Sequence, residues 1–181
     1  CVSEKGKPPV QISPTNNVLW KVQVPWSPSS PCVWRDRIFL SSFADDQLQT
    51  RCYSRKDGKW LWSRSIMPNK LELFHRSEGS PAASTPATDG KYVLCYFGSF
   101  GLVCYNIEGG EVWRRPMAVA ESSGGFGTGT SRVIVGKLAL LCRDQDQNSV
   151  LLALDVRTGK TVWETARPDA IGSFGTPIVW K

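Results

Sequence analysis

Histidine is almost absent from this chain of 181 residues, and His75 is the only one. Without a second histidine or a nucleophile-elbow motif, no Ser/His/Asp triad is expected. The six cysteines form no CxxC pair and have no neighbouring histidine, which argues against a zinc site. The sequence therefore predicts no catalytic residue and no metal site.

Five of the cysteines lie in apolar or strand-patterned runs, where cysteine commonly serves as a small buried hydrophobe. These five, expected to be free core thiols, are Cys32, Cys52, Cys95, Cys104 and Cys142. The sixth, Cys1, opens the chain. We interpret it as an arbitrary fragment boundary rather than a lipid-bearing mature N-terminus, because no processing signal precedes it. A lipid anchor follows only from the second interpretation.

Long apolar runs are also missing. No stretch of about 18 apolar residues is present, and no charged segment followed by an apolar one opens the chain. We therefore predict a soluble chain without a transmembrane segment. The last residues, 176–181, stop inside an expected strand, so both ends are interpreted as cut.

Basic residues outnumber acidic ones by 22 to 16, which gives a net charge of +6. They are scattered through expected turns, as at Lys59, Lys91, Lys137 and Lys160, and form no cluster interleaved with aromatic side chains. A nucleic-acid surface would need such a cluster. No nucleic-acid partner is expected.

Sustained helical periodicity is absent, and Met117–Ser123 is the only helix-like stretch. What the chain does have is eight Trp, sixteen Gly and twelve Pro. Bulky aromatic residues favour pleated sheets, while Gly and Pro punctuate them with tight turns. The composition therefore predicts an all-β fold.

An internal repeat determines which all-β fold is expected. The segments DGKWLW, EGGEVW and TGKTVW each place a glycine four residues before a tryptophan, and the tryptophans are 51 and 50 residues apart. The pairs are Gly58 with Trp62, Gly109 with Trp113, and Gly159 with Trp163. Glycine supplies the backbone freedom of a tight hairpin, and the alternation that follows sends the tryptophan to one face.

Each repeat contains four short strand patterns. A four-stranded sheet with two apolar faces cannot stand alone, and radial stacking of such sheets gives a β-propeller. We predict a partial propeller of about three four-stranded antiparallel blades within a single domain, 1–181. The expected blade units are 30–64, 85–115 and 130–165, with an edge strand of a neighbouring blade at 17–24 and another at 176–181.

The third repeat resembles the tryptophan-docking motif of pyrroloquinoline-quinone (PQQ) propellers, AxDxxTGxxxW, at every fixed position. The matching residues are Ala153, Asp155, Thr158, Gly159 and Trp163. The first two repeats are similar to degraded copies that keep only part of the motif, including Gly58 and Trp62 in one and Gly109 and Trp113 in the other. The resemblance implies structural roles: the tryptophan stacks on the adjoining motif, and the Asp and Thr positions hold the turn.

The PQQ-repeat family includes quinoprotein dehydrogenases, which hold PQQ and Ca²⁺, and non-catalytic relatives that resemble the BamB outer-membrane assembly lipoprotein. Dehydrogenases of this group often carry two adjacent cysteines, and no two are adjacent here. We therefore predict a non-catalytic scaffold that presents its loops to protein partners, without a cofactor. The alternative is a fragment of a PQQ- and calcium-dependent alcohol or sugar dehydrogenase. The resemblance implies the periplasm or cell envelope, while free cysteines favour the cytoplasm as the alternative.

In a propeller, ligands usually bind at the loops that join successive blades. The expected loops here are Pro68–Ser84, Pro116–Thr130 and Pro168–Thr176. His75 stands beside Arg76 and Glu78, but adjacent residues seldom face each other, so a loop-packing role is favoured over a catalytic one.

Two further motifs in these regions have simple structural interpretations. Gly124–Thr130 looks like a phosphate cradle, but no Lys-Ser/Thr end follows, and small residues that crowd near the axis explain it better. Asp144, Asp146 and Asn148 have the spacing of an EF-hand loop. Ser149 replaces the required glycine, so a polar hairpin tip is favoured over a Ca²⁺ site.

Overall fold

A computed structural model describes residues 9–122 and 124–180 of the chain, and this part contains twelve strands and no helix. Blade 1 consists of β1 (Cys32–Trp34), β2 (Arg37–Ala44), β3 (Gln47–Ser54) and β4 (Trp60–Ile66). Blade 2 consists of β5 (Ala87–Thr88), β6 (Tyr92–Phe97), β7 (Gly101–Asn106) and β8 (Glu111–Pro116). Blade 3 consists of β9 (Arg132–Val135), β10 (Leu138–Arg143), β11 (Val150–Asp155) and β12 (Thr161–Ala166).

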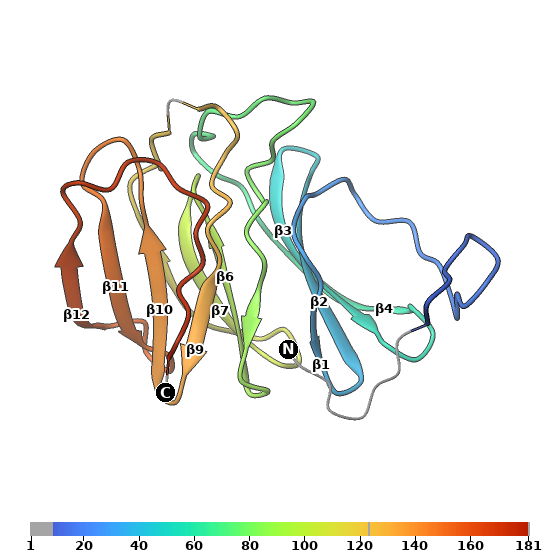
Figure 1. Ribbon diagram of the computed structural model, residues 1–181. Coiled ribbons are helices and arrows are strands. Elements are labelled where there is room, and N and C mark those ends of the chain that lie inside the picture. Colours follow the sequence, from blue (N-terminus) through green and yellow to red (C-terminus); the bar gives the residue numbers. More distant parts are fainter. Residues whose placement is uncertain (1–8, 123, 181) are drawn as a thin grey trace.

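Each blade is a sheet whose four strands follow one another in chain order and pair antiparallel. The first strands of successive blades lie against each other, β1 beside β5 and β5 beside β9, so the first strand of each blade is the inner one and the fourth is the outer one. Figure 1 shows the three sheets fanned side by side. The prediction of an all-β partial propeller with three four-stranded blades is confirmed.

The turn between the third and fourth strand has the same form in every blade. The glycine that precedes each tryptophan has a positive φ of 70°, 85° or 69° at Gly58, Gly109 and Gly159. Side chains with a Cβ rarely adopt this backbone conformation. The strand pairing shifts register at the same point in each blade, which is the mark of a β-bulge.

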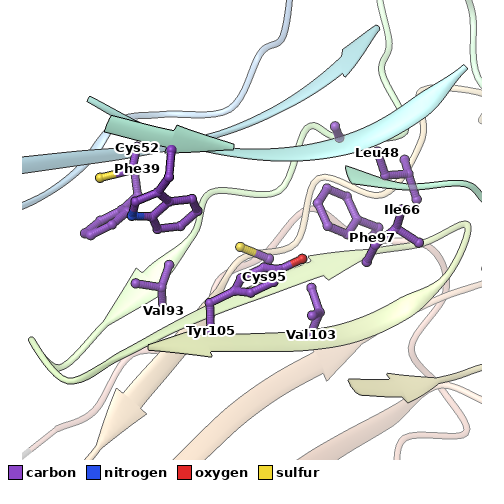
Figure 2. Packing of buried hydrophobic residues seen from close by; sticks show 11 residues of the cluster. Phe39, Leu48, Cys52, Ile66, Val93, Cys95, Phe97, Val103 and Tyr105 are labelled. Atoms are coloured by element: carbon purple, nitrogen blue, oxygen red, sulfur yellow. The ribbon is translucent and has the colours of Figure 1, made fainter. Parts of the chain in front are cut away.

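The hydrophobic core lies between blades and not within them. Along β6, Val93, Cys95 and Phe97 face blade 1, while Leu94 and Tyr96 face blade 3, and all five are buried. This alternation is the two-residue period of a strand covered on both faces. Figure 2 shows the first of the two clusters, with side chains of blades 1 and 2 interleaved between their sheets. Blade 2 therefore holds the three sheets together.

The flanking segments, predicted as edge strands of neighbouring blades, lie outside the three sheets. Residues 17–24 and 176–180 are not strands, because a strand needs a hydrogen-bonded neighbour and no further sheet lies beside them in the described part of the chain. Lys181 lies outside the described residues. The helix-like stretch also forms no helix over 117–122, and no helix that could cross a membrane occurs in residues 9–122 and 124–180.

The two ends of the blades carry different structures. One end, called here the loop end, holds the hairpin tips after β2, β6 and β10 and the connectors 67–86, 117–131 and 167–176. The connectors gather at the top of Figure 1. The other end, called the turn end, holds the glycine turns before β4, β8 and β12. The functional groups described below divide between these two ends.

Candidate functional site

Three tryptophans dock onto the turn of the following repeat at the turn end. The indole Nε1–H of Trp20 donates to the carbonyl of Arg55 at 2.9 Å, that of Trp62 to Ile107 at 3.2 Å, and that of Trp113 to Val156 at 2.9 Å. The acceptors are equivalent residues, three positions before the turn glycine in the first and third case and two before it in the second. Each tryptophan therefore links its own repeat to the next one.

The turn glycines provide the flat surface on which these indoles lie. A Cβ placed on Gly58, Gly109 or Gly159 would stand 2.6, 2.7 or 2.6 Å from a ring carbon of Trp20, Trp62 or Trp113, respectively. Real Cβ atoms do not approach so closely. The glycine is thus required twice, for its positive φ and for the contact with the ring.

Side-chain hydrogen bonds hold each turn in shape. Asp155 Oδ1 accepts from the backbone N–H groups of Arg157 and Thr158, and the Thr158 hydroxyl also lies 3.3 Å from it. Asn106 replaces the aspartate in the second repeat and accepts from Glu108 and Gly110. A short polar side chain that accepts from the backbone two residues ahead stabilises a tight turn. The arginine side chain of Arg157 lowers the pKa of Asp155.

Arginines add to the docking contacts, and sequence analysis did not predict them. Two residues after the docking tryptophans, Arg64 donates to the Gly109 carbonyl at 2.6 Å and Arg115 to the Gly159 carbonyl at 3.1 Å. Both bonds reach the same turn as the tryptophan of the same strand. The only available signal was an arginine at the same distance after two of the repeat tryptophans.

Trp163 is the tryptophan of the motif that matches the family pattern completely, and it has no such partner in the described residues. Its side chain is 40% exposed, against 8% for Trp62, and all of β12 is exposed. Ala153, which lies opposite Trp163 on the neighbouring strand β11, is in contrast fully buried. The outer strand of blade 3 therefore presents an undocked tryptophan.

The loop end carries a row of aromatic rings from successive connectors. The ring centroids of His75 and Phe126 are 5.7 Å apart and those of Phe126 and Phe174 are 6.5 Å apart, and both pairs meet edge to face. Phe74 also pairs with Phe126 through the backbone and contacts the ring of Phe43 at 6.0 Å. The histidine predicted to pack in its loop lies in this row, and the structure brings it to no proton-transfer partner among the described residues.

The glycine-rich segment packs tightly against this row. Gly125 and Gly127 have positive φ, and a Cβ on either would meet His75 or the backbone of Ser80. A Cβ on Gly129 would meet Phe174. Close packing accounts for these glycines, as expected, and no helix follows them to form a phosphate cradle.

A cavity of about 620 Å³ opens at the loop end between the first and second connectors. It is lined by two connector segments, 70–74 and 119–122, and by Asp146 from the hairpin tip of blade 3. The backbone N–H of Asp146 donates to the carbonyl of Glu121, which ties the tip to the second connector. Sequence reasoning placed the functional loops here but did not single out the cavity.

Glu72 is the buried ionisable group of this cavity. The residue is 4% exposed, and its Oε2 accepts a short hydrogen bond from the hydroxyl of Thr128. Its backbone N–H donates to Ser99 Oγ at 3.0 Å, and its Oε1 has no hydrogen-bond partner in the described structure. Burial raises the pKa of Glu72 to about 7, although the hydrogen bond from Thr128 opposes that shift.

The residues with EF-hand spacing form a hairpin tip between β10 and β11, as favoured from the sequence. Asp144 accepts from Arg167 through both of its carboxylate oxygens, at 2.7 and 3.1 Å, and from the Ser173 hydroxyl at 2.9 Å. The hydrogen bond from Arg167 lowers the pKa of Asp144. Asn148 occupies a left-handed turn with φ of 58°. A carboxylate so engaged is not free to bind Ca²⁺.

The five cysteines in the described residues are free, as expected. Cys52, Cys95 and Cys104 are fully buried, and burial raises the pKa of each thiol, to about 11 for Cys52. A thiol with a raised pKa is a poor nucleophile. These cysteines act as core side chains. Cys1 lies outside the described residues.

Comparison with known families agrees with this geometry. A family model described as outer membrane protein assembly factor BamB, which is built of PQQ repeats, matches residues 10–179. This chain belongs to that PQQ-repeat family. No curated protein sequence matches it significantly.

Solved structures similar to this PQQ-repeat chain include BamB from Moraxella catarrhalis, with a TM-score of 0.55 and 15% identity over 77% of this chain and 35% of that one. A europium-containing methanol dehydrogenase gives a TM-score of 0.56 and 15% identity over 78% of this chain and 25% of the enzyme. The computationally designed Ika4 protein gives 0.53 and 14% over 91% and 86% of the two chains. The chain thus spans about a third or less of the natural relatives, and these similarities show the fold alone.

Proposed function

We propose that this chain is part of a non-catalytic PQQ-repeat propeller that binds protein partners through its loop end. The observation that carries this proposal is the set of large apolar side chains exposed on the connectors. Leu73 is 64% exposed, Phe126 42%, Ile171 76% and Phe174 53%. Exposed apolar side chains gathered on one face are typical of interaction sites. They come from all three connectors, so the surface spans the blades.

The polar side chains near this surface support a structural role and not a chemical one. The Ser84 hydroxyl lies 2.7 Å from the carbonyl of Thr130 and 3.0 Å from that of Thr128, and the Thr130 hydroxyl lies within 2.9 Å of the carbonyls of Cys142 and Gly175. These hydroxyl groups join one connector to the next. None of them is paired with a general base, which an activated nucleophile needs.

The acidic, cysteine and histidine side chains are dispersed. Within residues 9–122 and 124–180, no three His, Cys, Asp or Glu side chains lie close enough together to hold a metal ion. The family description, an outer membrane assembly factor, further leads us to propose that the whole protein works in the cell envelope.

Site-specific photo-crosslinking in cells tests the proposed binding surface. A photoreactive phenylalanine analogue is placed at Leu73 or Ile171 on the loop end, and at Lys59 or Lys160 on the turn end as matched controls. We expect discrete protein adducts from the first pair and none from the second. Equal labelling from both pairs, or no adduct from the loop end, would contradict the proposed surface.

Titration of the whole protein with PQQ and Ca²⁺ tests the enzymatic alternative. A ligand that binds only the folded state raises its thermal stability. We expect no shift of the melting temperature and no dye-linked alcohol oxidation in folded protein. A saturable shift together with turnover would overturn the scaffold proposal and establish a quinoprotein dehydrogenase.

A further inference from the structure

The turn end gathers lysines and arginines that are scattered along the sequence. Within each blade, the turn between the first two strands lies beside the turn between the last two, and a backbone hydrogen bond joins them. In blades 1, 2 and 3 this bond runs from the N–H groups of Arg55, Ile107 and Val156 to the carbonyls of Asp36, Lys91 and Lys137, at 2.7, 3.1 and 2.9 Å. Both turns of every blade therefore lie at one end of the sheets, at the bottom of Figure 1.

The turns of blade 3 expose only positive charge. Lys137 lies in the turn between β9 and β10, Arg157 and Lys160 lie in the turn between β11 and β12, and all three are exposed. Asp155, the carboxylate of the second turn, is half-buried and is engaged by two backbone N–H groups and by Arg157. In the described residues, Lys137 and Lys160 thus project from the turn end without an ion pair.

Blade 1 adds a second group of cations at the same end. Its turns expose two carboxylates, those of Asp36 and Asp57, against the cations Arg35, Arg55, Lys56 and Lys59. The two turns touch, since the guanidinium of Arg55 donates to the carbonyl of Arg35 at 3.3 Å. Blade 2, between the two groups, is nearly balanced, with Lys91 against Asp89 and Glu108. The exposed turns of the three blades together therefore carry an excess of positive charge.

This positive charge lies on protruding turns and not in a cleft. A cavity of about 480 Å³ opens at the turn end between blades 1 and 2, but its charged lining is balanced, with Arg35, Arg37 and Lys91 against Asp36, Asp89 and Glu108. Arg37 and Glu108 pair there at 2.7 Å. A nucleic-acid strand would need a positive groove that follows its backbone. A broad anionic surface, in contrast, can meet the turns of all three blades at once.

Trp34 supplies an aromatic side chain at the same surface. It is the last residue of β1, it is 38% exposed, and its ring lies against Gly90 in the first turn of blade 2. Tryptophan, with an apolar body and a polar N–H, is enriched where proteins meet lipid headgroups. Basic side chains add to such contacts by attraction to anionic lipids. Exposed cations beside an exposed tryptophan therefore favour a membrane surface over an acidic protein.

We propose that the turn end lies against the anionic headgroups of a lipid bilayer. This inference goes beyond the proposed function, because it concerns the opposite end of the blades. The loop end exposes mainly carboxylates on its tips and connectors, and these are Asp45, Asp46, Glu78, Glu121, Asp146 and Asp169. Their repulsion from the same headgroups directs the loop end away from the bilayer, where protein partners have access to it.

Co-sedimentation of the whole protein with lipid vesicles tests this surface. Vesicles of phosphatidylcholine alone are compared with vesicles of equal parts phosphatidylcholine and phosphatidylglycerol, and we expect binding to the second kind only. A rise in ionic strength from about 0.1 M to about 1 M shortens the Debye length from about 10 Å to about 3 Å and should abolish this binding. Equal binding to both kinds of vesicle, or binding that resists salt, would overturn the inference.

Two double variants locate the contact. Lys137→Gln with Lys160→Gln removes two charges from the turn end and should weaken vesicle binding roughly 25-fold, because each basic side chain near an anionic membrane contributes about fivefold. Lys70→Gln with Arg76→Gln removes the same charge from the loop end and should leave vesicle binding nearly unchanged. An equal loss in both double variants would mean attraction by net charge alone, and the proposed contact would be wrong.

Two other anionic partners would give different results. Tighter binding to a short DNA duplex than to the anionic vesicles, at the same phosphate concentration, would replace the membrane by a nucleic acid. Discrete protein adducts from the photoreactive residue at Lys59 or Lys160 would replace it by an acidic protein. Either result would contradict the membrane contact. The cross-links from Leu73 and Ile171 test the proposed function separately, so the two can fail independently.

Discussion

Replacement of Trp62 by alanine should destabilise the protein far more than the same replacement of Trp60, two residues earlier in β4. The register shift in β4 places Trp62 opposite Cys52 and Trp60 opposite Tyr53, so the two indoles lie on opposite faces of the sheet although they are two residues apart. Trp60 is 66% exposed, whereas Trp62 is 8% exposed. Trp62 also packs against the rings of Phe39 and Tyr105, with centroids 5.9 and 6.0 Å away. The pair therefore compares docked and undocked tryptophan in the same sheet.

The magnitude follows from the burial and the hydrogen bond. A buried tryptophan removes about 200 Å² from water, which is worth about 5 kcal/mol at about 25 cal/mol per Å². The bond from Nε1–H to Ile107 adds about 1 kcal/mol, and freed side-chain entropy offsets part of the sum. We expect Trp62→Ala to lower the free energy of unfolding by about 4 kcal/mol, and Trp60→Ala by less than about 0.5 kcal/mol.

Urea unfolding followed by far-ultraviolet circular dichroism measures both values. Trp62→Phe should fall between the two, because it keeps a ring in the interface but loses the indole donor. The docking argument would be refuted if Trp62→Ala and Trp60→Ala shifted the free energy of unfolding by amounts within about 1 kcal/mol of each other.

Other perturbations test separate contacts. Gly109→Ala forces a Cβ against Trp62, whereas the Cβ of Gly136→Ala meets nothing within 4 Å, and both glycines have positive φ. In urea unfolding, Gly109→Ala should therefore lower the free energy of unfolding by about 1–3 kcal/mol more than Gly136→Ala does. Glu72 has a folded pKa of about 7, above its usual value, so its contribution to stability is full below about pH 4.5 and falls as the pH rises to 7. The free energy of unfolding of wild type minus that of Glu72→Gln should drop by about 3 kcal/mol across that window, and a flat difference would contradict the burial argument. Glu108→Gln removes only an exposed ion pair to Arg37 and should cost less than about 1 kcal/mol in the same assay. Arg37→Leu should cost more, since Arg37 also donates to Ile107 at 2.8 Å.

The repeat was readable in the sequence because its key residues act locally. Gly159 is needed at a positive φ, and Asp155 accepts hydrogen bonds from residues two and three positions ahead, so the turn leaves a short pattern of fixed spacing. The continuous apolar run of β6 likewise follows from burial on both faces. The flanking segments 17–24 and 176–180 stay a prediction, because an edge strand forms only beside a neighbouring sheet and the three described sheets do not include one there.

The loop-end cavity could not be predicted from the sequence, for a related reason. Glu72 lies in a connector without repeat pattern, and its partner Thr128 is 56 positions further along the chain. Nothing local distinguishes a buried carboxylate from the exposed one of Glu78 on the same connector. His75 is the only histidine in the sequence. The residue with the unusual environment is Glu72, three positions before it.

The docking contact also bears on how such chains change in length over evolution. Each repeat contains both halves of the contact, a turn that receives an indole and, four residues later, an indole that enters the following turn. Duplication of a segment of one period, about 50 residues, therefore inserts a new blade. The turn of the new blade receives the indole of the blade before it, and its own indole enters the turn of the blade after it. A loss of one period leaves equally matched neighbours. Blade number can thus drift by gene duplication or deletion without any compensating substitution at the junctions.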